Sequence, residues 1–373
     1  MMKTLFIIGN GFDCYDHNMN TQYIDFRNFL VNRYPEYNKD FGGILQETLM
    51  PDGDEVYDMN EVVGSLIRTI DECSLKDWNN LEECLGNEFI CNIAYDNEWL
   101  YKVTDDEDDN IFHSVYENED LTNSIAGAYH ILIDLFREWV FNELANIDFT
   151  RVQRLRKKPT FRKSLFLTFN YTLTLEKLYN ISPNNICHIH GKSDDRNCHI
   201  YFGHGDDTEF DAFENYIGVG DAYNGLKREL RKDTNQAIVE NMKFFRKLSN
   251  VKKIYSYGFS FSEVDMVYIK EISRILDAKR VRWYFNQYDW INNQENIEKV
   301  TLHDAYGEVD FYLLPFMKPA YVKNIFVDGT PETYSDAVKE IIKREKIDYK
   351  DKRNVLVSHQ FYVGEKAESP ETV

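Results

Sequence analysis

The chain has 373 residues, of which 43% are hydrophobic and 15% aromatic, so it can bury a sizeable core and is not expected to be intrinsically disordered. Its 63 Asp and Glu residues against 43 Lys and Arg give a net charge of −20, which disfavours direct binding to nucleic acid or to an anionic membrane. No stretch has the roughly 20 apolar residues of a membrane span or the roughly 7–15 of an export signal. The six cysteines form no C-x-x-C pair, so we expect a cytoplasmic protein with reduced thiols, no disulfide framework and no cysteine zinc site.

Short apolar runs predict the strands of a parallel sheet. The first run is 4–8, which a Gly-Asn-Gly turn follows directly; the later runs are 164–169, 186–189, 199–202, 253–257, 281–285 and 309–313. Continuous apolar runs of this length are typical of strands that are buried on both faces. Helix-like segments follow most of them, and this alternation favours an α/β, doubly wound core.

A different pattern separates the first predicted strand from the second. Apolar residues recur at helical spacing within 62–70 and again within 125–139. We therefore predict a mainly helical insertion at 41–160 in an α/β nucleotide-binding core made of 1–40 and 161–330. Residues 331–363 are expected to form a C-terminal helix and extension, and 364–373, which has almost no apolar residues, a disordered tail.

Polar residues follow several of the predicted strands, at the sheet edge where ligands bind in open α/β folds. The first group is Gly9, Asn10, Gly11, Phe12 and Asp13. Glycines there allow a tight turn that approaches a pyrophosphate, whose charge the N–H groups of the next helix can meet. Cys14 stands where a dinucleotide fingerprint has its third glycine, so a plain strand-to-helix turn explains the pattern about equally well.

Two candidate catalytic side chains follow later strands. Asn170 could hold a ribose hydroxyl or an attacking water, although a helix cap or an Asx turn is the simpler interpretation. His190 is expected nearer the crevice, because Gly191 opens the turn, and could act as a general base. His188, on the same face of the strand, is expected to be buried and hydrogen-bonded. A metal site is a weaker alternative, with the ligands His188, His190, His204 and Asp13.

The segment 257–265 contains a turn with Gly258 and Ser260 that enters a helix. A helix N-terminus can accept an anion, but an ordinary capped helix explains the segment about equally well. Ser262, with Asp265 three residues later, indicates a capping box that opens this helix. Asn286, at the end of a later strand, marks a further exit from the sheet.

Taken in order, these groups resemble the bacteriophage abortive-infection AbiH family. The motifs are Gly-Asn-Gly-Phe-Asp at 9–13, Thr-Phe-Asn-Tyr-Thr at 168–172, His-Ile-His-Gly at 188–191, Tyr-Phe-Gly-His-Gly at 201–205 and Tyr-Gly-Phe-Ser-Phe-Ser-Glu-Val-Asp at 257–265. Trp-Asn-Asn-Leu-Glu at 78–82 is a less specific element, and His-Asn-Met-Asn at 17–20 departs from the Gly-x-Pro-Thr-like stretch expected there. The resemblance implies antiviral defence, with a phage-encoded trigger and a second copy of the chain as partners to consider.

The same series is similar, at greater distance, to the sirtuin-like, Rossmann-like NAD-binding fold. By position, this similarity assigns the nicotinamide ribose to Asn170 and the catalytic base to His190. The residues it assigns to the dinucleotide phosphates are Gly9, Asn10 and Gly11, beside Phe12 and Asp13, and those for the adenosine half are Gly258, Ser260 and Asn286. Thr172 replaces the Asp of the sirtuin motif, and the zinc-binding cysteine pairs are absent from the sequence. The departures argue against an acyl-lysine deacylase and predict no metal.

The two resemblances together imply an anti-phage protein that binds NAD and hydrolyses it to ADP-ribose and nicotinamide. A non-catalytic nucleotide sensor stays open as an alternative. A metal-dependent hydrolase is the less favoured third hypothesis.

Overall fold

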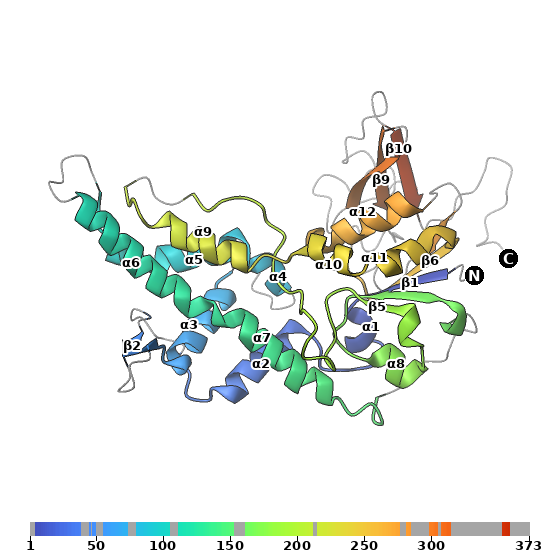
Figure 1. The fold of residues 1–373 in the computed structure, drawn as a ribbon, viewed down its shortest axis with the longest axis horizontal. Coiled ribbons are helices and arrows are strands. Elements are labelled where there is room, and N and C mark those ends of the chain that lie inside the picture. Colours follow the sequence, from blue (N-terminus) through green and yellow to red (C-terminus); the bar gives the residue numbers. More distant parts are fainter. Residues whose placement is uncertain are drawn as a thin grey trace, which may run out of the picture.

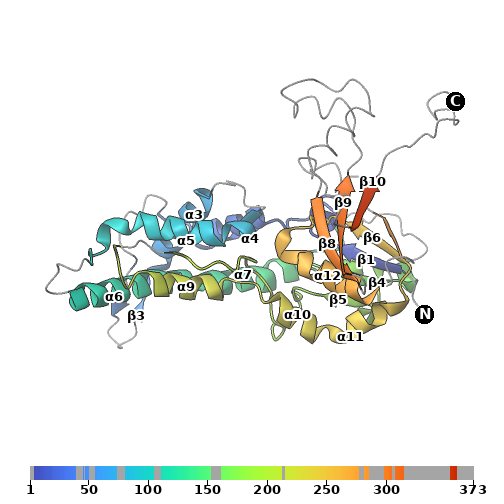
Figure 2. The ribbon, with the colours of Figure 1, turned by 90° about the horizontal axis from the view of Figure 1, so that it is seen from above.

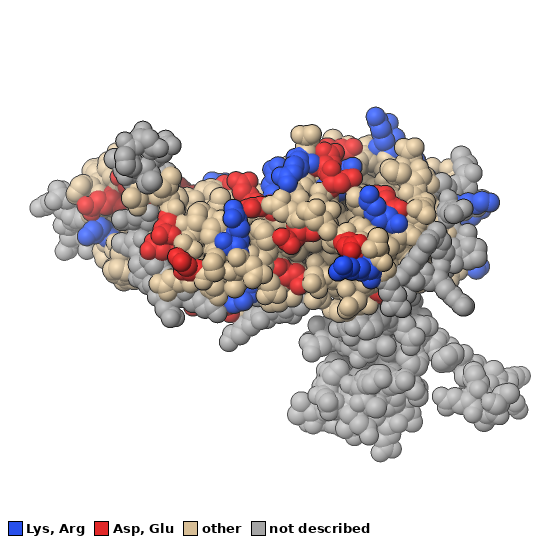
Figure 3. Space-filling model, turned by 90° about the horizontal axis from the view of Figure 1, so that it is seen from below, with Lys and Arg blue, Asp and Glu red and all other residues tan. Residues whose placement is uncertain are grey.

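The computed structural model describes residues 4–38, 45, 47–49, 55–73, 80–104, 111–152, 161–211, 215–276, 281–284, 298–304, 307–314 and 353–358. The molecule is elongated, with a helical part at one end and an α/β part at the other (Figures 1 and 2). On the face drawn in Figure 3, acidic and basic side chains are interspersed, so the described surface there shows no broad area of one sign.

A five-stranded sheet forms the centre of the α/β part. Its strands are β1 (Thr4–Ile8), β4 (Leu165–Thr168), β5 (Ile186–His188), β6 (Lys253–Tyr257) and β7 (Arg282–Tyr284), in the order β5-β4-β1-β6-β7. All neighbours pair in parallel. After β1 the chain adds β4 and β5 on one side of it, and later β6 and β7 on the other side. The order in which strands are added therefore reverses between β1 and β6. In open α/β sheets ligands bind at such a reversal.

Helices cover both faces of this sheet, as the buried apolar strands predict. Leu5 and Ile7 of β1 pack on one face with α10 (Thr234–Glu240), α11 (Met242–Phe245) and α12 (Met266–Ile275). Phe6 and Ile8 point to the other face, which α1 (Gly11–Cys14) and α8 (Thr174–Tyr179) cover. The predicted mixed α/β fold with a parallel sheet is therefore confirmed.

The helical part has a core of its own. Its helices are α2 (Tyr23–Arg33), α3 (Met59–Asp71), α4 (Leu81–Cys84), α5 (Asn87–Asp96), α6 (Ile111–Tyr129), α7 (Ile131–Asn142) and α9 (Gly220–Glu229). This part extends beyond the segment 41–160, because Phe26 of α2 and Tyr223 of α9 are buried in the same core. The helical spacing at 125–139 belongs to two helices, α6 and α7, which separate at His130.

Short elements complete the described fold. They are the hairpin β2 (Thr48–Leu49) and β3 (Glu55–Val56), and the 3-10 turns η2 (Glu98–Leu100), η3 (Leu144–Asn146), η4 (Phe161–Lys163), η5 (Pro183–Asn185), η6 (Arg246–Asn250) and η7 (Glu263–Asp265). None of the helices that the structure describes has the length and apolarity needed to cross a membrane.

One of the predicted strands is wrong. Residues 199–202 form no strand: Ile200 and Phe202 pack into the core of the helical part, whereas Tyr201 packs into that of the sheet, so the run lies between two cores. Within 331–363, where a C-terminal helix and extension are predicted, residues 353–358 form strand β10 (Arg353–Ser358). It joins β8 (Glu298–Asp304) and β9 (Gly307–Leu314) in a second sheet, which also takes the run 309–313. The other residues of 331–363 and the tail 364–373 lie outside the described residues.

A disulfide corrects the expectation that all cysteines are reduced. Cys73, just after α3, is bonded to Cys84 of α4, with their Cα atoms 6.1 Å apart. The other cysteines are free thiols: Cys14, Cys91, Cys187 and Cys198. The spacing of the bonded pair matches no familiar motif, so only the packing of α4 against the end of α3 brings the two sulfurs together.

Candidate functional site

The loops that follow β1 and β6 pack against each other, backbone against backbone. The N–H of Gly9 donates to the Tyr257 carbonyl at 2.9 Å, and the N–H of Gly11 donates to the Gly258 carbonyl at 3.0 Å. The N–H groups of Phe12 and Asp13 bond within the turn, to Gly9 and Asn10 carbonyls. The N–H groups predicted to meet a pyrophosphate are therefore already used inside the protein.

Gly258 is required by this contact. Its φ is +58°, and a Cβ there would overlap the backbone nitrogen of Phe12. We expect Gly258→Ala to lower the free energy of unfolding by at least about 3 kcal/mol, through strain and overlap together. Gly225→Ala in α9 is the matched control, because a Cβ there meets open space, and it should raise stability by about 0.5–1 kcal/mol. Urea denaturation measures both, and equal effects would contradict this interpretation.

The other predicted ligand-binding residues are separated. The Asn10 amide donates to the Thr21 carbonyl at 2.8 Å and accepts from the Thr21 hydroxyl at 2.7 Å, so it fastens the next loop. Phe12 is buried, Ser260 is exposed, and Asn286 lies outside the described residues.

Asp13 and Asn170 form a buried polar cluster at the carboxyl ends of β1 and β4. The Thr172 hydroxyl donates to Oδ2 of Asp13, and it lies 3.0 Å from the Thr174 hydroxyl. Burial raises the pKa of Asp13 above its ordinary value of 3.8, and this outweighs the hydrogen bonds of Thr172, Thr174 and Asn170, which lower it. Oδ1 of Asp13 and Oδ1 of Asn170 are buried without a hydrogen-bond partner among the described residues. Such orphaned atoms call for a ligand or a water.

The raised pKa of Asp13 predicts a pH-dependent stability. A carboxyl group that holds its proton more tightly in the folded chain stabilises the fold most below its ordinary pKa, and this contribution is lost as the pH rises through the folded value. Asp13→Asn cannot ionise, so it should gain stability over the wild type at pH 7 but little at pH 4. Denaturation at both pH values tests this, with exposed Asp120→Asn as control; a gain that does not depend on pH would contradict it.

Both histidines of the motif at 188–191 are buried and paired with carboxylates. His188 Nε2 lies 2.9 Å from Oε1 of Glu176, and its Nδ1 lies 3.1 Å from the Asn170 carbonyl oxygen. His188 is therefore hydrogen-bonded as expected. The side chain of His190 is 5% exposed and that of His188 is 8% exposed, so both are largely shielded from solvent.

His190 belongs to a buried network of charged groups, which we call the His190 network: His190, Asp265, Lys232 and Glu82. Nε2 of His190 lies 3.1 Å from Oδ1 of Asp265, and Nζ of Lys232 lies 3.3 Å from the same oxygen. Nζ of Lys232 also lies 2.6 Å from Oε1 of Glu82. The ring of Tyr268 is among those that pack around His190.

Sequence reasoning missed three members of this network. The sequence pattern predicts that Asp265 caps a helix. In the structure the turn η7 precedes α12, the Ser262 hydroxyl donates to Oδ2 of Asp265 at 3.3 Å, and Oδ1 of Asp265 faces His190. One sequence feature could have marked Glu82 as functional, its place in the Trp-Asn-Asn-Leu-Glu element. No sequence feature marks Lys232.

The charges of the network stabilise one another. Burial would raise the pKa of Asp265, but Lys232 and His190 outweigh it and hold this pKa below its ordinary value. Burial would lower the pKa of Lys232, but Asp265 and Glu82 more than compensate. Two carboxylates and one ammonium leave one net negative charge beside the imidazole of His190. An imidazole paired with a carboxylate is an arrangement that the general bases of many enzymes share.

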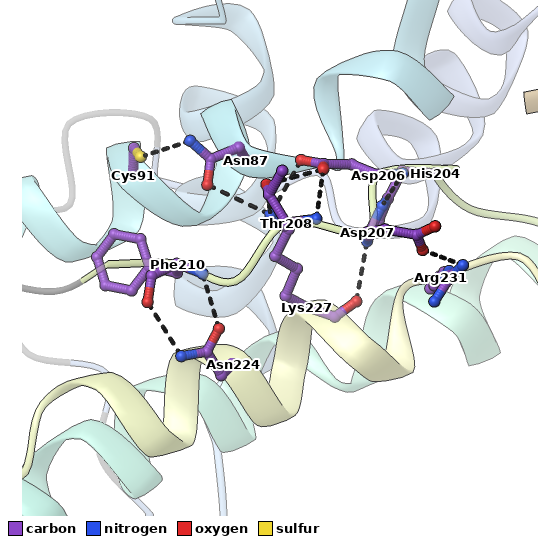
Figure 4. Close-up of polar contacts among 10 residues, drawn as sticks. All are labelled: Asn87, Cys91, His204, Asp206, Asp207, Thr208, Phe210, Asn224, Lys227 and Arg231. Atoms are coloured by element: carbon purple, nitrogen blue, oxygen red, sulfur yellow. Dashed lines mark hydrogen bonds and ion pairs between the residues drawn. The ribbon is translucent and has the colours of Figure 1, made fainter. Parts of the chain in front are cut away.

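The four proposed metal ligands do not converge. His204 accepts a hydrogen bond at Nδ1 from the Asp206 N–H (3.1 Å), and its Nε2 donates to the Lys227 carbonyl at 2.9 Å, so both nitrogens are occupied (Figure 4). Among the residues that the structure describes, no three His, Cys, Asp or Glu side chains are placed to hold a metal.

A cavity of about 750 Å³ lies apart from this network. It is lined by the loop 17–20, by α2, by Trp139 of α7 and by the segment 143–152 that follows α7, and neither Asn170 nor His190 lines it. The loop at 17–20, where the sequence departs from the expected motif, therefore borders a cavity that is separate from the His190 network.

The fold and the network define a mixed α/β protein with a histidine–carboxylate pair at the carboxyl ends of a parallel sheet. Residues 5–287 match the family described as bacteriophage abortive infection AbiH, and the chain belongs to that family. The match confirms the resemblance of the motifs and indicates a role in abortive infection. No curated protein and no solved structure matches the chain.

Proposed function

We propose that this abortive-infection protein binds NAD at the carboxyl ends of β1, β4 and β5 and hydrolyses it to ADP-ribose and nicotinamide. The observation that carries the proposal is the buried His190–Asp265 pair at the end of β5, with Asn170 following the neighbouring strand. The sirtuin-like order of the motifs supplies NAD as the ligand.

In the proposed reaction, the bond between the ribose carbon and the nicotinamide nitrogen breaks, and its electron pair stays with nicotinamide, which leaves as a neutral molecule. The oxygen of a water bonds to the ribose carbon, and the water proton passes to His190. Asp265 holds the imidazole through Nε2, so Nδ1 is the nitrogen that would take the proton. Base catalysis of this kind contributes about 10²–10⁴-fold to a rate.

Asn170 would orient the reacting groups. Its Oδ1 has no hydrogen-bond partner among the described residues, so it is suited to accept from the attacking water or a ribose hydroxyl. Asn170 is 6% exposed and His190 4%, so the covering segments must move before NAD can enter. This burial suits a protein that is inactive at rest and that a phage-encoded trigger opens.

The test is nicotinamide release from NAD by the full chain, measured by chromatography, with and without an extract of infected cells. We expect release by the wild type and a large loss with Asn170→Ala, but not with Asn184→Ala at an exposed turn. Tight NAD binding without release would instead establish the nucleotide sensor. Loss of release on chelation would favour the metal-dependent hydrolase.

A further inference from the structure

Two buried lysines hold ion pairs in this region: Lys227 within the helical part, and Lys232 between the helical part and the α/β part. Nζ of Lys227 lies 2.9 Å from Oδ2 of Asp206 and donates to Oδ1 of Asn87, at the start of α5, at 3.3 Å (Figure 4). Lys232, whose side chain is 0% exposed, pairs with Glu82 of α4 and with Asp265. A buried ammonium is costly unless it is paired, so both lysines fix the groups that surround them.

The backbone around Lys232 is held in place. The N–H of Lys232 donates to the His204 carbonyl at 2.9 Å, and the N–H of His204 donates to the Leu230 carbonyl at 3.1 Å. Gly203 has a φ of +131°, and a Cβ there would overlap the Leu230 carbonyl, so this close approach depends on a glycine. Lys232 therefore has little freedom to follow a partner that moves.

Glu82, in contrast, is anchored in the helical part. Its neighbour Leu81 and nearby Cys84 are buried in the core of that part, and the disulfide to Cys73 ties α4 to the end of α3. Asp265 and His190 lie beside residues of the sheet core. The His190 network thus crosses from one core to the other through Lys232.

We propose that Glu82 and Lys232 are positioning residues for His190, through which the helical part controls the base. This inference rests on the function proposed above. Oδ1 of Asp265 contacts both His190 and Lys232. While Glu82 pairs with Lys232, the negative charge of Asp265 can stabilise a protonated His190. When α4 moves Glu82 away, Lys232 pairs with Asp265 alone, and its positive charge then destabilises the protonated imidazole.

Among the residues that the structure describes, two further titratable side chains contact the ring of His190, and both are neutral. Tyr171 and Tyr268 contact its ring, and burial raises the pKa of both phenols well above the ordinary value. The charges that act on His190 from the elements packed against it are therefore those of Asp265, Lys232 and Glu82.

The test is a pH titration of the His190 imidazole by NMR in the full chain, with the signal assigned by its loss in His190→Gln. We expect Glu82→Gln to shift the titration to lower pH and Lys232→Met to shift it to higher pH, each on the order of one pH unit. Lys227→Met is the matched control: it removes a buried, paired lysine that does not touch Asp265, and should leave the titration in place.

A second readout is kinetic. Glu82→Gln should lower kcat for nicotinamide release about tenfold with KM little changed, and Glu82→Asp should restore part of the loss. The inference would be overturned if His190 titrated at the same pH in Lys232→Met and Lys227→Met, or if Glu82→Gln did not shift this pH. If Lys232→Met does not fold, the titration of Glu82→Gln alone decides. Should no sample release nicotinamide, the proposed function fails, while the titration still decides the coupling.

Discussion

Replacing His190 by Gln is expected to lower the rate of nicotinamide release by about 10²–10⁴-fold, because it removes the proposed base. His188→Gln should leave the rate nearly unchanged. The two histidines lie two positions apart, both are buried, and each pairs with a carboxylate, Glu176 for His188 and Asp265 for His190. The comparison therefore separates the loss of a base from the loss of a buried pair.

Thermal denaturation of both variants serves as the control for this comparison. Similar melting temperatures with very different rates would support the role of His190. Equal losses of rate in the two variants would show that burial and packing, and not proton transfer, explain the effect.

Lys232→Met is expected to lower the free energy of unfolding by about 3–5 kcal/mol, because it leaves Glu82 and Asp265 as buried carboxylates without their shared ammonium. The double variant Lys232→Met/Glu82→Gln should recover part of the loss, since one of the two carboxylates that lost the ammonium becomes a neutral amide. Urea denaturation near pH 7 measures both. A double variant no more stable than Lys232→Met would show that Glu82 and Lys232 are not energetically coupled.

Much of the sheet could be predicted from short-range pattern. The apolar runs located β1, β4, β5 and β6, because strands buried on both faces leave an uninterrupted apolar signature. The run at 199–202 carries the same signature for another reason, since its side chains divide between two cores. Composition along the chain does not distinguish these cases.

The candidate site was predictable only in part. Asn170 and His190 stand out because polar residues follow buried strands. Asp265 pairs with a histidine 75 positions away, and within its own segment it looks like an ordinary helix cap. The glycines also indicate that the backbone lies close to another group, but the sequence does not identify that group. In the structure it is backbone, because Gly11 and Gly258 pack against each other.

The disulfide between Cys73 and Cys84 has a consequence for how the protein is prepared. A sample reduced with dithiothreitol and a sample kept in air differ in their covalent structure at α4, the helix that contains Glu82. Thiol counting under denaturing conditions tells them apart, with four reactive sulfhydryls in the oxidised species and six in the other. Assays on the two preparations are comparable only when that count accompanies them.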